Sequence, residues 1–169
     1  DGIEVNKQEA SRYHKMSADR GNTDAMLCYG YMLDNSDGIE VNKQEASRYY
    51  KMSADGGNTK AMFNYGIMLY KGDGIEINKQ ESARYYKMSA DGGNIQAMFS
   101  YAYILYKGDG IDVNKQEASR YYKMSADQGN IVAMFIYSDM LYKGDGIEVN
   151  KQEAARYMKM SADGGNIVA

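Results

Sequence analysis

Residues 37–72 read DGIEVNKQEASRYYKMSADGGNTKAMFNYGIMLYKG, and the chain repeats this stretch with few changes. The Asp-Gly-Ile opening recurs every 36 residues and leads each time into Asn-Lys-Gln-Glu; it stands at Asp1, Asp37, Asp73, Asp109 and Asp145. A fixed period of this length is typical of solenoid proteins, in which each repeat stacks on its neighbours. The sequence therefore predicts one repeat array over residues 1–169, with an incomplete fifth unit.

Each repeat predicts two helices. Asn42 stands three residues before a glutamate, which is the spacing of a capping box, so a helix is expected to begin there. It is expected to end near Asp55, where a glycine pair suits a left-handed cap. A second helix is expected from Asn58 to Lys71, and a further one begins at Asn166. Together the units predict about nine helices.

Repeated columns also predict which side chains fill the core. A tyrosine in the middle of the helix that begins at Asn58, and of its equivalents, is expected to bury its ring and keep its hydroxyl at the rim; this column holds Tyr29, Tyr65, Tyr101 and Tyr137. Methionines two positions past the aromatic pair are expected to fill core gaps; they are Met16, Met52, Met88, Met124 and Met160. His14 replaces a tyrosine ring and is expected to pack as one.

The first complete turn departs from the pattern. Asp34-Asn35-Ser36 stands where later units have Tyr-Lys-Gly. Because asparagine tolerates the left-handed conformation, Asn35 is expected to keep the turn, with a less stable cap than glycine gives.

The run Ala61-x4-Gly66-x5-Gly72-x-Gly74-Ile75, with Tyr85-Tyr86, Ala90 and Gly93 after it, resembles the Sel-one-like repeat family of tetratricopeptide-like proteins. The resemblance covers the whole chain. Tetratricopeptide units themselves fit less well, because they are about 34 residues long and usually carry a proline, whereas this repeat has 36 residues and no proline. It implies an all-α fold, a right-handed superhelical α-solenoid of 36-residue antiparallel helix pairs. It also implies that the helix beginning at Asn58, with its equivalents, lines the concave side.

The repeats differ most on that same helix. The variable columns are four and three residues apart, so they share one face, and aromatic columns flank them. We expect a concave groove that binds a peptide or a partner helix, as in an interaction scaffold or adaptor. Neutral drift at exposed positions is the alternative. The predicted partner-binding residues are Asp24, Leu27, Cys28, Tyr31, Lys60, Phe63, Asn64, Ile67, Tyr70, Gln96, Phe99, Ser100, Tyr103, Tyr106, Val132, Phe135, Ile136, Asp139 and Tyr142.

Composition argues against several other functions. With 20 basic and 23 acidic residues, no basic stripe invites nucleic acid, and no apolar run approaches the roughly 20 residues of a membrane span. His14 and Cys28 are single in the chain, so no catalytic residues, metal site or cofactor are expected, and the protein is not expected to be an enzyme. The lone cysteine and the missing glycosylation sequon favour a cytoplasmic location.

A second class of function stays open at this point. The chain could be a structural or assembly component that packs through its convex helix, around Lys43, Arg48 and Lys51. No polar terminal cap is evident, so a segment of a longer protein is expected, and end-to-end or lateral self-association is allowed.

Overall fold

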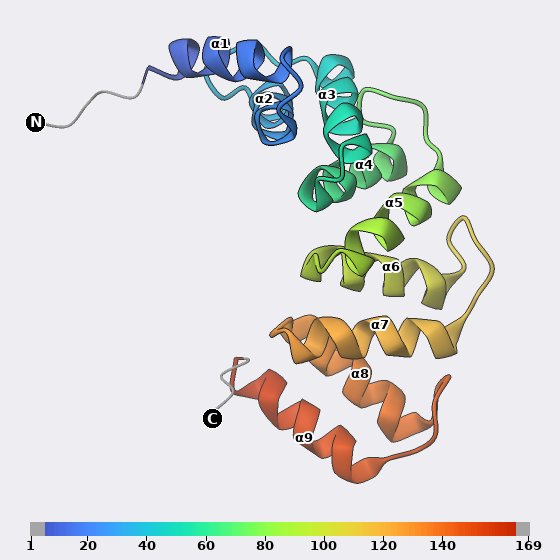
Figure 1. Cartoon of the computed structure of the whole chain (residues 1–169). Coiled ribbons are helices and arrows are strands. Elements are labelled where there is room, and N and C mark those ends of the chain that lie inside the picture. Colours follow the sequence, from blue (N-terminus) through green and yellow to red (C-terminus); the bar gives the residue numbers. More distant parts are fainter. Residues whose placement is uncertain (1–5, 165–169) are drawn as a thin grey trace, which may run out of the picture. The chain divides into compact units, whose positions relative to one another are not determined.

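The computed structural model describes residues 6–164, which form nine helices and no strand (Figure 1). The predicted all-α repeat fold is confirmed. The predicted helix start at Asn166 lies outside the described residues. The helices are α1 (Lys7–Ala18), α2 (Thr23–Asn35), α3 (Lys43–Asp55), α4 (Thr59–Lys71), α5 (Lys79–Asp91), α6 (Ile95–Lys107), α7 (Lys115–Asp127), α8 (Ile131–Lys143) and α9 (Lys151–Ala162).

Two compact units divide the chain, Asp1–Met88 and Ser89–Ala169, and the division falls within α5. In the first unit, α2 packs against α1 and α3, and α3 packs against α4. In the second unit, α6 packs against α7, α7 against α8, and α8 against α9. In both units, contacts therefore join helices that follow one another in the chain, as expected for stacked repeats.

Asparagine side chains begin the helices at the predicted positions. Asn42 Oδ1 accepts a hydrogen bond from the Glu45 backbone N–H at 2.9 Å, and Asn58 Oδ1 accepts one from the Ala61 N–H at 3.0 Å. Each bond satisfies one of the backbone donors that a helix start leaves unpaired. The predicted end at Asp55 is also confirmed, and Gly57 takes the left-handed conformation there with a φ of 93°.

The prediction for the first turn was wrong about the residue. Asn35 is the last residue of α2, and Ser36 takes the left-handed conformation with a φ of 57°. Among residues 6–164, Ser36 is the one non-glycine residue with a positive φ. The reason is the length of the helix. α2 ends at Asn35 as α4 ends at Lys71, so Ser36 stands at the same column as Gly72.

We expect Ser36→Gly to raise the free energy of unfolding by about 1 kcal/mol, because glycine removes the cost of a Cβ in the left-handed region. The Ser36 hydroxyl contributes little in return, since its bond to the Ile39 carbonyl is 3.3 Å long. Urea denaturation followed by circular dichroism measures the change. Gly72→Ser, at the same column, should lower stability; a Ser36→Gly protein no more stable than the parent would contradict the argument.

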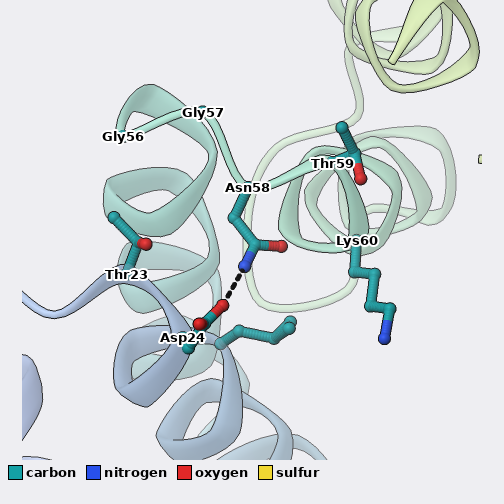
Figure 2. A pocket seen from close by; sticks show the side chains of 8 residues that line it. Thr23, Asp24, Gly56, Gly57, Asn58, Thr59 and Lys60 are labelled. Carbon is teal, nitrogen blue, oxygen red and sulfur yellow. Dashed lines mark hydrogen bonds between the residues drawn. The ribbon is translucent and has the colours of Figure 1, made fainter. Parts of the chain in front are cut away.

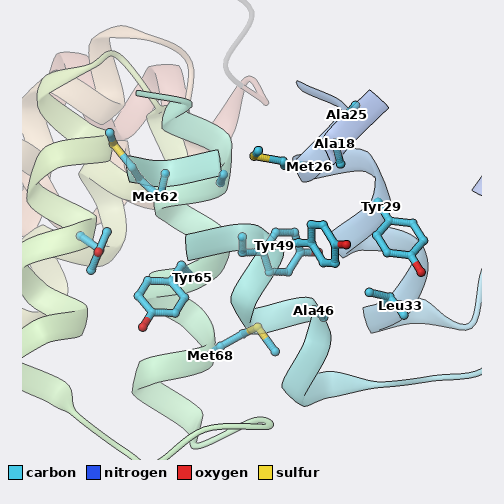
Figure 3. Close-up of a cluster of buried hydrophobic side chains, with 14 of the residues drawn as sticks. Ala18, Ala25, Met26, Tyr29, Leu33, Ala46, Tyr49, Met62, Tyr65 and Met68 are labelled. Atoms are coloured by element: carbon cyan, nitrogen blue, oxygen red, sulfur yellow. The ribbon is translucent and has the colours of Figure 1, made fainter. Parts of the chain in front are cut away.

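Buried tyrosines from successive helices belong to the core of the first unit (Figure 3). The ring of Tyr65 meets the ring of Tyr85 edge to face, with centroids 4.8 Å apart, and Tyr101 meets Tyr121 in the same way at 4.9 Å. All four rings are buried, and so are Tyr29 and Tyr137, so the predicted burial of the tyrosine column is confirmed at all of its positions. At the same column, burial raises the pKa of Tyr137 to about 12.

The helices α1, α3, α5, α7 and α9 are called the second-type helices. Polar contacts join one second-type helix to the next one along the chain. In the first unit, the Tyr49 hydroxyl donates to Asp19 at 3.1 Å, while the Lys15 ammonium holds the same carboxylate at 3.0 Å. In the second unit, the Tyr121 hydroxyl donates to Asp91 at 2.6 Å. The aspartate before each glycine turn therefore receives a tyrosine from 30 residues further on.

Two core expectations hold only in part. In the methionine column, Met16, Met52 and Met88 are 41%, 46% and 40% exposed and do not fill the core, whereas Met124 and Met160 are half-buried. Each of the three exposed methionines stands four residues after an exposed arginine, and so on the same face of its helix. His14 is half-buried, whereas Tyr50 at the same column is buried, so the histidine packs less completely than the ring it replaces.

Candidate functional site

The predicted partner-binding residues lie on α2, α4, α6 and α8, which we call the first-type helices. Every one of them is exposed or half-buried, whereas their neighbours Ala61, Met62 and Tyr65 are buried. The columns four and three residues apart thus share an accessible face, as the helical period requires. Three pockets open on or beside this face, two in the first unit and one in the second.

The first pocket, which we call the Asp24 pocket, lies between the starts of α2 and α4 and has a volume of about 410 Å³. Figure 2 shows Asn58 joined to Asp24, with Lys60 reaching out from α4. Asn58 Nδ2 donates to Asp24 Oδ1 at 2.8 Å, while Asn58 Oδ1 caps α4. The pocket therefore combines an acidic and a basic side chain from adjacent repeats. Its lining is Thr23, Asp24, Leu27, Gly56, Gly57, Asn58, Thr59 and Lys60.

The second pocket, the Asp34 pocket, lies between the ends of the same two helices and has a volume of about 350 Å³. The Lys43 ammonium bonds the Asp34 carboxylate and also lies 3.3 Å from Asp73. The hydrogen bond to Asp34 is the main cause that raises the pKa of Lys43, and the contact with Asp73 adds to the rise. Burial raises the pKa of Tyr50, and the Asp34 carboxylate adds to the rise. The lining is Tyr31, Asp34, Asn35, Lys43, Tyr50, Asn64, Ile67, Met68, Lys71 and Asp73.

The third pocket, the Tyr142 pocket, belongs to the second unit and measures about 380 Å³. It lies between α8 and α9, and its wall is apolar where Ala154, Ala155 and Met158 line it. Met158 takes the column of Tyr50 and is 43% exposed. The lining is completed by Ser138, Asp139, Tyr142 and Lys151, whose ammonium lies 5.6 Å from the Tyr142 ring centroid.

The structure brings together only part of the predicted set. Asp24, Leu27 and Lys60 share the first pocket, Tyr31, Asn64 and Ile67 the second, and Asp139 and Tyr142 the third. The remaining predicted residues line none of these three pockets: Cys28, Phe63, Tyr70, Gln96, Phe99, Ser100, Tyr103, Tyr106, Val132, Phe135 and Ile136.

Phenylalanines of the expected aromatic floor pack partly against a tyrosine of the helix that follows in the chain. The Phe63 ring lies 5.6 Å from that of Tyr86, and the Phe99 ring lies 5.7 Å from that of Tyr122. Both phenylalanines are half-buried, whereas Phe135 is 53% exposed. The floor is therefore accessible to different degrees from one repeat to the next.

Lys43 lines a pocket that the sequence analysis did not assign to it. It belongs to α3, the helix on which it was expected with Arg48 and Lys51, and it lines the Asp34 pocket with the predicted Tyr31. As the first residue of α3, it sits beside the end of α2 and reaches across to the loop after α4. The signal was in the sequence, because the lysine of the Asn-Lys-Gln-Glu motif stands 30 residues before the aspartate of a later Asp-Gly-Ile, as Lys43 does before Asp73.

The same lysine contact recurs in the second unit. Lys115 Nζ lies 2.7 Å from Asp145 Oδ1, and the Tyr106 hydroxyl donates to the other oxygen at 2.6 Å. Lys115, and after it Tyr106, hold the pKa of Asp145 below its usual range. Asp145 should therefore stay ionised at a pH where an unfolded carboxyl is half protonated.

We expect Lys115→Met to return the pKa of Asp145 towards the ordinary value of about 3.9. Because the folded pKa is lowered, the stability from this contact is present above the unfolded pKa and is lost as pH falls through the folded value. Side-chain carboxyl ¹³C shifts between pH 7 and pH 2 measure the titration. Lys123→Met serves as the control, and an Asp145 titration that is the same in all three proteins would contradict the contact.

No metal site or membrane span emerges from the part of the chain that the structure describes. Across residues 6–164, no three His, Cys, Asp or Glu side chains gather as metal ligands would. None of the helices α1 to α9 has both the length and the apolar character that crossing a membrane takes. Cys28 is a free, exposed thiol.

Comparison with known proteins agrees with this architecture. The Sel1 repeat family matches five consecutive stretches, residues 1–22, 23–58, 59–94, 95–130 and 131–166. No curated protein sequence matches the chain. Four of the five matched stretches begin at the first residue of α2, α4, α6 or α8, the helices that carry the predicted partner-binding residues.

Solved structures share the fold. A Sel1 repeat protein from Oxalobacter formigenes aligns with a TM-score of 0.89 and 28% identity, over 99% of this chain and 69% of its own. The protective antigen c5321 of uropathogenic Escherichia coli, which displays an SLR fold, aligns with a TM-score of 0.91 and 24% identity. That alignment covers 94% of this chain but only 34% of the antigen, so the chain spans about a third of that protein. With the repeats, the helix pairs and these neighbours in agreement, the chain belongs to the Sel1 repeat family.

Proposed function

We propose that this chain is a protein–protein interaction scaffold that binds a peptide or a partner helix along the accessible face of its first-type helices. Sel1 repeat proteins generally mediate protein–protein interaction. The observation that carries the proposal is in the first unit, where two pockets open between α2 and α4 and contain repeat-variable residues at both ends. Side chains that differ from repeat to repeat, held in pockets by regularly packed helices, are suited to selecting one peptide or partner helix over another.

The two pockets have a spacing that suits a short segment of a partner. Asp24 in one pocket and Tyr31 in the other are seven residues apart on α2, which is roughly 10 Å along the helix axis. About three residues of extended peptide span that distance, as do two turns of a helix. Leu27 lies between them on the same face and supplies apolar contact.

The second unit offers a more apolar version of this face. Val132, Phe135 and Tyr142 of α8 are 55%, 53% and 59% exposed, and Tyr142 borders the apolar Tyr142 pocket. Exposed aromatic and aliphatic side chains of this kind are enriched where proteins bind one another. We infer a non-catalytic adaptor of the cytoplasm that contacts its partner with polar pockets in one unit and apolar side chains in the other.

Assembly through the second-type helices is the alternative, and the exposed methionines favour it. Met16, Met52 and Met88 form a repeated, adaptable column beside basic residues such as Arg48. Methionine-rich surfaces adapt to varied partners. In that case the first-type helices would remain unoccupied while α3 and its equivalents packed against another subunit.

Selection from a displayed library of random twelve-residue peptides, followed by fluorescence anisotropy, separates the two. We expect Lys60→Glu with Tyr31→Ala to weaken selected peptides at least about tenfold, since both side chains border the pockets. Arg48→Ala with Met52→Ala is the matched control on α3 and should leave binding unchanged. Loss of binding in the α3 variant alone, with the pocket variant still binding, would favour assembly through the second-type helices.

A further inference from the structure

The Asp34 pocket exists at a column where this repeat departs from the others. The later units carry a tyrosine there, and a lysine of the following helix covers it: Lys79 Nζ lies 5.2 Å from the Tyr70 ring centroid and Lys115 Nζ lies 4.9 Å from that of Tyr106. Asp34 replaces the ring with a short carboxylate. The space between α2 and α4 is left open, and its charge is changed.

The charged side chains that line the opening are two carboxylates, those of Asp34 and Asp73, and two ammonium groups, those of Lys43 and Lys71, so their formal charges balance. Lys43 provides one ammonium for two carboxylates, those of Asp34 and Asp73. The C-terminal ends of α2 and α4 both reach the pocket, and the carbonyl groups at a helix end act as partial negative charge. The start of α3 has the opposite polarity, but Glu45 in its first turn offsets it. Lys71 at the rim is the remaining positive charge.

An aromatic surface stands next to the acidic one. Tyr31 and Asp34 are three residues apart on α2, so their side chains lie on the same face, and the Tyr31 ring is 52% exposed. A guanidinium group can stack on a tyrosine ring and bond a carboxylate with two parallel N–H groups at once. A lysine ammonium can do only one of these well, because it is a point charge.

We propose that the Asp34 pocket binds an arginine side chain of the partner, stacked on Tyr31 and hydrogen-bonded to Asp34 and Asp73. This inference rests on the proposed function, since it names the side chain that the bound segment brings to one of the two pockets. Asn64 lines the opposite wall and can accept from the guanidinium or hold the peptide backbone through its amide. Arginine therefore sets the register of the bound segment, and Leu27 and the Asp24 pocket contact the residues beside it.

Two small probes test the pocket directly. Nα-acetyl-arginine methylamide carries the charge, and Nα-acetyl-citrulline methylamide has nearly the same shape without it. In ¹H–¹⁵N NMR titrations we expect the arginine probe to shift the backbone signals of Tyr31, Asn64 and Asp73, with the citrulline probe at least about fivefold weaker. Binding of the arginine probe should also weaken as salt is raised from 50 to 300 mM.

The decisive variant is Asp34→Tyr, which restores the residue of the other repeats and so should fold. It is expected to abolish the shifts caused by arginine. Ser36→Gly, two residues away, repairs the same turn without touching the pocket and should bind like the parent. Tyr31→Ala, at an exposed position, should weaken binding several-fold. Equal binding of arginine and citrulline, or shifts retained by Asp34→Tyr, would overturn the inference.

The peptide selection described above keeps the two proposals apart. Selected peptides that need Lys60 and Tyr31 but carry no enriched arginine, together with no binding of the arginine probe, would refute the arginine pocket and leave the interaction scaffold standing. An arginine probe that binds in the pocket while no displayed peptide binds the face would support the pocket and count against the scaffold. Enrichment of arginine at one peptide position, lost in Asp34→Tyr, is the result we expect.

Discussion

Replacing Tyr121 with alanine is expected to destabilise the protein by about 3–5 kcal/mol, the range for removing a large aromatic side chain from a core. The Tyr121 ring is completely buried and meets the Tyr101 ring edge to face at 4.9 Å. Its hydroxyl donates to Asp91 at 2.6 Å, so the truncation also removes a link between successive second-type helices. Urea denaturation followed by far-ultraviolet circular dichroism measures the loss.

The repeat supplies its own control for that experiment. Tyr13 occupies the same column but is 60% exposed, so Tyr13→Ala should change stability by no more than about 0.5 kcal/mol. Tyr121→Phe keeps the ring and removes only the hydroxyl, and should cost about 0.5–1.5 kcal/mol. Equal losses at Tyr13 and Tyr121 would show that the column, and not burial, decides the effect.

Gly74→Ala is the second large effect, and we expect it to cost several kcal/mol. Gly74 has a φ of 77°, where an alanine loses about 1–2 kcal/mol from backbone strain alone. A Cβ at this position would also lie 2.4 Å from the Lys43 carbonyl carbon, which is far inside van der Waals contact. Because the obstacle is the backbone of Lys43, rotating a side chain cannot relieve the clash. The loop after α4 would have to move away from the start of α3.

Gly57→Ala separates the clash from the strain. Gly57 has a φ of 93°, and a Cβ added there would meet no atom within 4 Å. Its replacement should therefore cost only the backbone term, about 1–2 kcal/mol. The difference between the unfolding free energies that the two alanine variants lose, measured in the same urea titration, gives the destabilisation caused by the clash with Lys43. If both cost the same, the loop after α4 is not held against Lys43.

The pocket residues show how far internal repeats can predict a site. Comparing columns within the chain identifies Asp24, Lys60 and Tyr31 as variable, and all three line pockets. The same comparison passes over Lys43, because an invariant column does not stand out by variation. Its position in a pocket depends on where the end of α2 and the loop after α4 lie around it.

Spacing alone also cannot tell which side of a helix faces the neighbouring repeat. The methionine column has the regular period of a core position, yet Met52 is 46% exposed while Met62 is buried. Likewise, α3 has Ala46-Ser47 where α5 has Ser82-Ala83, so the serine stands one position earlier in α5. The Ser47 hydroxyl donates to the carbonyl of Gln44 in its own helix, whereas the Ser82 hydroxyl donates to the carbonyl of Gly66 on α4 at 2.7 Å. Both outcomes depend on the packing of one helix against another.

The sequence by itself determined the repeat, its helix boundaries and its family, because capping asparagines, turn glycines and a 36-residue period act through local backbone geometry and repeat in every unit. Tertiary structure decided the rest. The opening between α2 and α4, the ammonium of Lys43 shared by Asp34 and Asp73, and the burial of the Tyr121 ring all come from contacts between different helices and loops. Such contacts depend on how the helices pack, and a single column of sequence does not contain that information.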